Sequence, residues 1–156
     1  MFSYRLCRES DKDCWITVNR MFMAEEIQDN DLWNDTNKVS SEQFTNTFFE
    51  ALHAKELINL LIFEENNTPV GFANLMTTYS VWTHGKALIL DDLYLLPEAR
   101  GKGYGKCAMD FIEQFAVQRG CKRLQFQSEE TNPNAMKFYI ALGYHPANMK
   151  FYVKYL

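Results

Sequence analysis

The chain has 156 residues, of which 47% are hydrophobic and 23% charged, and its formal net charge at pH 7 is −4. This length and apolar content suit one globular domain with a sizeable core. No apolar run approaches the roughly 20 residues of a membrane helix, and the first residues lack the basic-then-apolar order of a signal peptide. The acidic balance, without a basic face or stripe, argues against a nucleic-acid-binding protein.

The cysteine pattern bears on compartment and on metal binding. Cys7, Cys14, Cys107 and Cys121 form neither a CxxC pair nor a cluster with zinc-ligand spacing. We therefore expect four free thiols, a reducing cytoplasm and no bound metal.

The first half of the chain predicts a strand, two helices and a hairpin. Residues 4–10 form a short strand, and after an N-cap at Ser10 or Asp11 apolar residues recur at near-helical spacing, at Trp15, Val18, Phe22 and Ile27. A second helix follows an N-cap at Ser40 or Ser41, with an apolar face made of Phe44, Phe48 and Leu52. Residues 56–65 and 70–82 are expected to pair as strands across the turn residues 66–69.

The second half predicts two helices and three strands. The strand 86–96 ends at Pro97, and a helical apolar period then runs from Gly103 to Gly120. A short strand follows over 121–128, and Asn132 is placed to cap a helix that Gly143 ends. Residues 151–156 are expected to form a last strand. The order β-α-α-β-β-β-α-β-α-β is that of one mixed α/β domain.

A glycine-rich turn joins the strand 86–96 to the following helix. Gly101, Gly103 and Gly105 alternate there with basic residues, in the order Arg100, Lys102 and Lys106. Strand, glycine turn and helix together direct backbone N–H groups and the positive helix end at one anion. The P-loop pattern fails because the glycines are too close together and Cys107 follows the lysine, and the dinucleotide pattern GxGxxG fails on spacing as well.

The pattern that fits is R-x-x-G-x-G, from Arg100 through Gly103 to Gly105, and it resembles the pyrophosphate loop of the GNAT acetyltransferases. A second motif, A-x-x-F-Y-x-x-x-G-Y from Ala135 to Tyr144, resembles a later helix of the same family. The resemblance covers residues 57–145 and implies a single N-acetyltransferase domain over residues 1–156. The implied fold is α/β (mixed α+β), with a central mixed, mostly antiparallel sheet flanked by helices.

The resemblance implies acetyl-CoA as co-substrate. The loop would hold its pyrophosphate, and a strand that splays from its neighbour would leave backbone free for the pantetheine arm. A backbone N–H there would also polarise the thioester carbonyl. The implied contacts are Leu93, Leu95, Arg100, Gly101, Lys102, Gly103, Tyr104, Gly105, Lys106, Asn132 and Lys137.

The implied chemistry needs a base and an acid, because an alkyl ammonium has a pKa near 10.4 and must lose a proton before it attacks. Tyr139 aligns with the family's tyrosine that protonates the leaving thiolate. Asp91 or Asp92 would serve as base, and neighbours in a strand face opposite sides, so one of the pair would point into the cleft. The other interpretation makes one a surface residue and the other a structural acceptor. Cys107 allows a rival acetyl-enzyme route, but no histidine lies near it in sequence, and direct transfer is favoured.

The acceptor is suggested by residues 77–95, which resemble the diamine (spermidine/spermine) acetyltransferases and fungal histone and polyamine acetyltransferases. Acidic side chains and an aromatic face suit a polyamine, and the candidates are Trp82, Asp91, Asp92, Glu26 and Glu129. Trp33 lies in a stretch without a counterpart in that branch. Two alternatives are a protein lysine or N-terminal acetyltransferase and a non-catalytic acyl-CoA sensor. We expect a small-molecule amine substrate, no nucleic-acid or membrane partner, and a homodimer.

Overall fold

The computed structural model describes residues 1–26 and 38–156. These form two compact units, residues 1–126 and 127–156. The second unit contains α4 (Pro133–Ala141). The first unit contains β1 (Phe2–Leu6), a 3-10 turn (Glu9–Asp11), α1 (Lys12–Glu26), α2 (Ser41–His53), β2 (Ile58–Glu65), β3 (Thr68–Ser80), β4 (Gly85–Leu95), a 3-10 turn (Pro97–Ala99), α3 (Tyr104–Gln118) and β5 (Arg123–Phe126).

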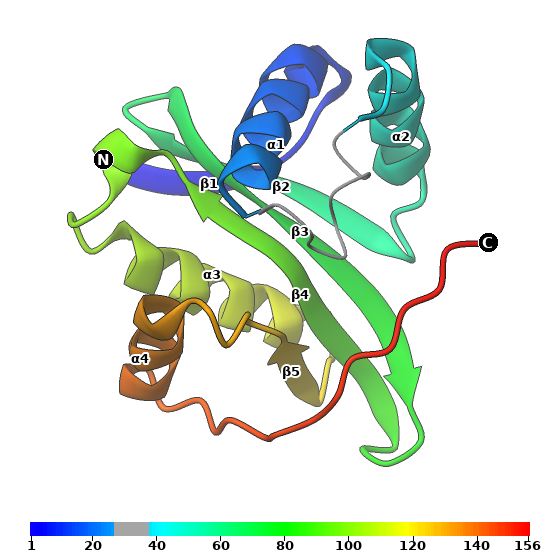
Figure 1. Cartoon of the computed structure of the whole chain (residues 1–156), viewed down its shortest axis with the longest axis vertical. Helices are drawn as coiled ribbons and strands as arrows, with labels where there is room; N and C mark the ends of the chain where they lie inside the picture. Colours follow the sequence, from blue (N-terminus) through cyan, green and yellow to red (C-terminus); the bar gives the residue numbers. More distant parts are fainter. Residues whose placement is uncertain (27–37) are drawn as a thin grey trace. The chain divides into compact units, whose positions relative to one another are not determined.

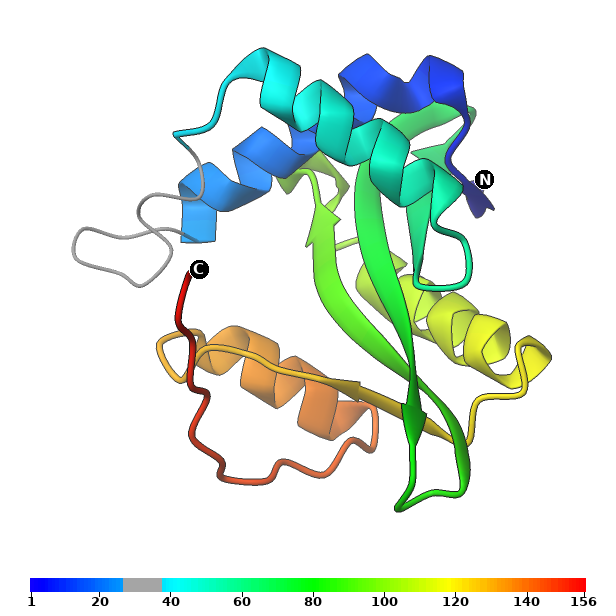
Figure 2. The same ribbon diagram turned by 90° about the vertical axis from the view of Figure 1, so that its right-hand side faces the viewer.

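The sheet of the first unit has five strands in the order β1-β2-β3-β4-β5. Strands β1 to β4 are antiparallel, and β5 runs parallel to β4. Helices α1 and α2 cover one face and α3 covers the other (Figures 1 and 2). The predicted mixed, mostly antiparallel sheet flanked by helices is therefore confirmed, while the single domain over 1–156 stays a prediction.

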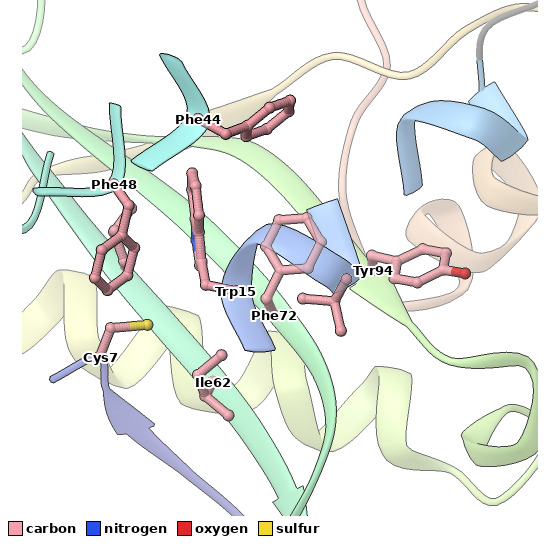
Figure 3. Packing of buried hydrophobic residues seen from close by; sticks show 9 residues of the cluster. Cys7, Trp15, Phe44, Phe48, Ile62, Phe72 and Tyr94 are labelled. Atoms are coloured by element: carbon pink, nitrogen blue, oxygen red, sulfur yellow. The ribbon is translucent and has the colours of Figure 1, made fainter. Parts of the chain in front are cut away.

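Aromatic residues fill both faces of the sheet. Between the sheet and the two N-terminal helices, Trp15 packs beside Phe48 with ring centroids 5.4 Å apart (Figure 3). On the opposite face, Phe2 stacks on Tyr104 at 4.4 Å, and Tyr4 lies 4.4 Å from Phe111. These contacts fix the first turns of α3 against β1, and with them the end of the glycine loop.

Several local predictions are confirmed by backbone geometry. Asn66 and Asn67 both have positive φ, 52° and 65°, as a two-residue type I′ hairpin turn requires. The Ser40 hydroxyl accepts a hydrogen bond from the Gln43 N–H (3.1 Å), and Asn132 accepts one from the Ala135 N–H (3.1 Å). Each side chain thus satisfies an N–H that its helix leaves without an acceptor.

The prediction of a last strand over 151–156 is wrong, because these residues have no regular structure. Their aromatic and apolar content suits a strand, but a strand exists only where another backbone completes its ladder. Five of the six residues are exposed. The first strand also ends early, at Leu6 instead of residue 10, because a 3-10 turn follows. Ile27, predicted on the first helix, lies outside the described residues.

Candidate functional site

The glycine loop has the backbone geometry of an anion site. Gly101 and Gly103 have φ of 75° and 79°, and Gly103 is the N-cap of α3. A Cβ atom at either position would meet no atom within 4 Å beyond the adjoining residues, so packing does not require glycine there. The left-handed backbone does. The first turn of α3, from Tyr104, presents N–H groups that have no acceptor within the helix. The loop therefore offers open space beside a positive helix end.

The strand before the loop has an open edge. The ladder between β4 and β5 covers Ala87–Leu90, whereas the ladder with β3 continues to Leu95. In the described part of the chain, residues 91–95 thus have a strand partner on one side alone. The Leu96 N–H donates to Val70 O on β3 (2.9 Å), and the alternation of an antiparallel ladder turns the N–H groups of Leu93 and Leu95 to the open side.

The basic side chains of the loop each contact a carboxylate. Arg100 donates from Nη2 to Glu25 Oε2 on α1 (2.7 Å) and from Nε to Leu95 O (2.9 Å). Lys102 lies 3.0 Å from Glu65 Oε2, and Lys106 lies 2.9 Å from Asp110 Oδ2. In this structure the side chains of Arg100, Lys102 and Lys106 are paired with carboxylates, and the groups of the loop that remain for an anion are its backbone N–H groups.

Tyrosine hydroxyls share two of these carboxylates. Tyr94 donates to Glu25 (2.6 Å), and Tyr104 donates to Glu65. Burial disfavours the ionised form of Glu25, but the hydrogen bonds from Tyr94 and Arg100 outweigh it and lower the pKa of that carboxyl. Sequence reasoning missed Glu25 and Glu65 as partners of the loop, because the motif contains its cations and not the carboxylates that lie far from it in the chain.

The acidic pair lies at an irregularity of β4. Asn74 is opposite Asp92 while Leu75 is opposite Leu90, so Asp91 is one residue more than β3 matches, a β-bulge. The regular alternation behind the prediction that the two face opposite sides is interrupted at this point. Burial raises the pKa of Asp92 to about 6; the Asp91 charge adds to this, and a hydrogen bond from Asn74 opposes it. Partial burial also raises the pKa of Asp91, which keeps an exposed surface.

A buried amide network underlies Asp92. Asn74 Nδ2 donates to Asp92 Oδ2 (2.7 Å) and to Asn19 Oδ1 on α1 (3.3 Å). The Trp15 indole N–H donates to Asn74 Oδ1 (3.2 Å), and Asn19 Nδ2 donates to Trp15 O (2.7 Å). Sequence reasoning missed these residues, although one signal was available: Asn74 interrupts the apolar run of β3.

The second unit carries the remaining predicted residues. Tyr139 lies on α4, half-buried, with its ring 5.1 Å from that of Phe138 and edge-on to that of Tyr144 at 6.2 Å. The side-chain oxygen of Asn132 caps α4. Lys137 is exposed, as is Glu129. Their roles stay predictions.

The predicted acceptor residues of the first unit are spread out. Trp82 is 92% exposed at the tip of the β3–β4 hairpin. The strand from Gly85 to Asp91 alone spans about 20 Å, so the structure does not bring Trp82 to the acidic pair. Glu26 is the last residue of α1. Trp33 lies outside the described residues.

The described residues also bear on metal binding, membrane insertion and thiol chemistry. Within residues 1–26 and 38–156, no group of three or more His, Cys, Asp or Glu side chains is arranged to hold a metal ion. In that same part of the chain no helix has the length and hydropathy needed to cross a bilayer. Cys107 is half-buried on the first turn of α3, and burial raises the pKa of the Cys7 thiol to about 12.

Comparisons with known proteins agree with this geometry. Residues 21–144 match the model of the acetyltransferase (GNAT) family. An uncharacterized N-acetyltransferase, YhfO, of Bacillus subtilis is 34% identical over 107 residues, 69% of this chain and 72% of that protein. Thialysine N-epsilon-acetyltransferase of Sus scrofa is 29% identical over 145 residues, 88% and 82% of the two chains. A possible acetyltransferase from Clostridium difficile has a similar structure (TM-score 0.82, 16% identity, 100% and 98% covered).

Proposed function

Because the chain belongs to the GNAT acetyltransferase family, we propose that it transfers the acetyl group of acetyl-CoA directly to a primary amine of a small, polyamine-like molecule. N-acetyltransferase activity and the use of acetyl-CoA are properties of that family. The acceptor and the roles of individual residues are our proposal.

The observation that carries the proposal is the position of Asp92, which is half-buried beside the bulge of β4 and hydrogen-bonded to the neutral amide of Asn74 (2.7 Å). Its pKa of about 6 leaves it ionised at neutral pH and still basic enough to take a proton from an acceptor ammonium, directly or through water. A carboxylate in contact with an arginine would be a weaker base, whereas Asp92 receives a neutral amide N–H. Asp91 would supply a second negative charge for a cationic acceptor.

The residues around the glycine loop suit acetyl-CoA. When bound, this co-substrate supplies the acetyl group as an activated thioester. The N–H groups of Gly103, Tyr104, Gly105 and Lys106 would hold its phosphates, supported by the open space beside Gly101 and Gly103. The backbone of Leu93 and Leu95 would bind the extended arm at the open edge of β4. Lys102, Asn132 and Lys137 are proposed as further contacts.

The phenol of Tyr139 is proposed to protonate the leaving thiolate. Tyr139→Phe keeps the ring that contacts Phe138 and Tyr144 and removes the hydroxyl. We expect turnover to fall by about 10² or more while acetyl-CoA still binds, since the loop does the binding. Unchanged turnover would remove Tyr139 from the mechanism.

A small cationic acceptor is supported by charge. Asp91 and Asp92 adjoin the open edge of β4, and the chain as a whole is acidic, which favours approach of a cation. The porcine relative acts, by its name, at the ε-nitrogen of thialysine. A protein lysine or N-terminus is the second candidate. Glu26 and Glu129 are kept as proposed acceptor contacts, whereas Trp82 lies too far from the acidic pair to share one small acceptor with it.

Thiol release from acetyl-CoA, measured against spermidine, spermine, putrescine, lysine, thialysine, an aminoglycoside and a histone-tail peptide, tests the acceptor. Selective turnover of the small amines is expected. Turnover of the peptide alone would move the acceptor to protein lysine. Acetyl-CoA binding without turnover of any amine would favour the sensor function. Light scattering of the purified protein tests the proposed homodimer, and its fractionation from cells tests the proposed cytoplasmic location.

The loop assignment has a matched control within one helix. Gly103 and Gly120 flank α3, both have positive φ (79° and 72°), and both have open space where a side chain would lie. Alanine costs each a similar backbone strain of about 1 kcal/mol. Gly103→Ala should weaken acetyl-CoA binding in calorimetry, and Gly120→Ala should not. Equal affinity for the two variants would refute the loop assignment.

A further inference from the structure

We propose that Asn74 is a positioning residue for the base: its amide holds Oδ2 of Asp92 in a fixed direction and leaves Oδ1 to take the acceptor's proton. This inference rests on the proposed function. Asn74 Nδ2 lies 2.7 Å from Asp92 Oδ2, and among the described residues no hydrogen bond reaches Oδ1. One oxygen is thus anchored and the other is left for chemistry.

The orientation of the Asn74 amide is set from α1. The two ends of an asparagine amide have nearly the same shape, so only their partners decide which end faces Asp92. The Trp15 indole can donate but not accept, and it lies 3.2 Å from Asn74 Oδ1. If the amide were flipped, its NH₂ group would face the Trp15 N–H and its oxygen would face the Asp92 carboxylate. Neither hydrogen bond could then form. Trp15 therefore locks the NH₂ group toward the carboxylate.

Asn19 completes the lock. Its Oδ1 accepts the second N–H of Asn74 (3.3 Å), and its own Nδ2 is bound to the Trp15 carbonyl one turn earlier (2.7 Å). Trp15, Asn19 and Asn74 are 4%, 2% and 5% exposed, so water does not compete for these hydrogen bonds. A buried amide left without a hydrogen-bond partner lowers the stability of the fold by about 1–3 kcal/mol, and an apolar residue at the same position has no such cost. Such a network in an apolar core is explained by the carboxylate that it holds.

The charges around Asp92 show what the hydrogen bond does. The groups that reach Asp92 from β3 and α1 are neutral: Asn74, with Asn19 and Trp15 behind it. Among the described residues, its charged neighbour on β4 is Asp91. Burial and the Asp91 charge favour the protonated acid, and the Asn74 N–H favours the carboxylate. Without that donor, Asp92 should take up its proton at a higher pH.

Three variants and a control test this in the full-length protein. Asn74→Leu removes the donor to Asp92. Trp15→Phe keeps an aromatic side chain but removes the indole N–H, which frees the Asn74 amide to turn. Asn74→Asp places a second carboxylate, of the same shape as the amide, beside Asp92. Asn59→Leu is the control, because Asn59 is also buried (6% exposed), and its amide is bound to backbone carbonyls of Lys55 and Ile58. The readouts are the pH dependence of kcat/KM and a carbon-13 NMR titration of the Asp92 carboxyl.

We expect the acid limb and the Asp92 titration to move to higher pH in Asn74→Leu, so that the loss of kcat/KM is about tenfold larger at pH 6 than at pH 9. Trp15→Phe should move them less. Asn74→Asp should move them in the same direction, since two adjacent carboxylates share a proton, and it also serves if Asn74→Leu does not fold. Asn59→Leu should lower the stability of the fold and leave both the acid limb and the Asp92 titration where they are in wild type. Titrations that stay unmoved in both Asn74 variants would overturn the inference.

Asp92→Asn separates this inference from the proposed function. Retained turnover in Asp92→Asn would show that Asp92 is not the base. The NMR titration of Asp92 in wild type and in the Asn74 variants would still show whether Asn74 holds the carboxyl. Lost turnover in Asp92→Asn, together with unmoved titrations in the Asn74 variants, would refute the positioning role alone.

Discussion

Asp11 and Asp92 both accept hydrogen bonds from nitrogen donors, and they differ in the charge of those donors. Asp11 accepts from Nη1 and Nη2 of Arg5 (2.7 and 2.9 Å) and from the Arg8 N–H (2.6 Å), and the guanidinium lowers its pKa. Asp92 accepts from a neutral amide, and burial raises its pKa to about 6. The comparison teaches that a cationic donor lowers the pKa of a carboxylate, whereas a half-buried carboxylate with a neutral donor keeps a raised pKa.

The largest expected difference between the two is in catalysis. Asp92→Asn should lower kcat/KM by about 10²–10⁴-fold, since it removes a base and keeps the side-chain shape. Asp11→Asn should leave the turnover of the folded enzyme near wild type, because Asp11 lies in the 3-10 turn before α1 and pairs with Arg5 of β1. Steady-state rates, corrected for the folded fraction by circular dichroism, check this. Similar losses in both variants would break the comparison.

The stability of the two variants should change in opposite directions. Asp11→Asn removes an ion pair whose side chains are 26% and 10% exposed, and we expect a cost of about 2–4 kcal/mol in the free energy of unfolding. Because the folded pKa of Asp11 is lowered, its contribution is complete above the unfolded pKa, about 4, and disappears as the pH falls through the folded value. Urea unfolding of wild type and variant at pH 7 and pH 3 should show the gap closing in acid.

Asp92→Asn should instead stabilise the fold by about 1–3 kcal/mol at pH 8, because it removes a half-buried charge whose ionised form burial disfavours. The folded pKa of Asp92 is raised, so its ionisation destabilises the native state increasingly as the pH rises from about 4 to about 6, and fully above that. The gain from the variant should therefore vanish near pH 4. Thermal melts across this range measure it. A variant that is less stable than wild type at pH 8 would show that burial does not disfavour this charge.

The smallest expected effect concerns Glu25, a carboxylate of the Asp11 kind beside the glycine loop. If Glu25 braces Arg100 and the loop, Glu25→Gln should weaken CoA binding about three- to tenfold, a modest loss because the pair is half-exposed. If Glu25 competes with the phosphates for Arg100, affinity should rise. Calorimetry decides the sign. Asp110→Asn makes the same charge change at the exposed pair with Lys106 and is the control.

Local signals predicted much of this molecule. The turn at Asn66 and Asn67 and the caps Ser40 and Asn132 follow from backbone demands within a few residues. The R-x-x-G-x-G pattern likewise predicted a glycine turn that leads into a helix, as Gly103 and α3 show, while the phosphate site there stays a prediction. Such features need only their neighbours in the chain.

What could not be predicted depends on residues far apart. Trp15 meets Asn74 across 59 positions, Glu25 meets Arg100 across 75, and no motif joins them. The bulge at Asp91 arises from the register against β3, so the regular alternation on which the prediction for the acidic pair depends is interrupted there. The expected strand over 151–156 failed for the same reason, since a ladder depends on a second backbone that composition does not supply.

Asp91, the extra residue in β4, divides that strand into two parts with different hydrogen-bonding partners. From Ala87 to Leu90 it is hydrogen-bonded on both sides and serves the sheet. Beyond Asp91, in the described part of the chain, it is bonded to β3 alone. A chain without Asp91 could pair with β3 in unbroken register, and such a sheet would be more regular. The protein instead keeps a strand whose first half has a partner on both sides and whose second half has one open edge, with the proposed base where the two halves meet.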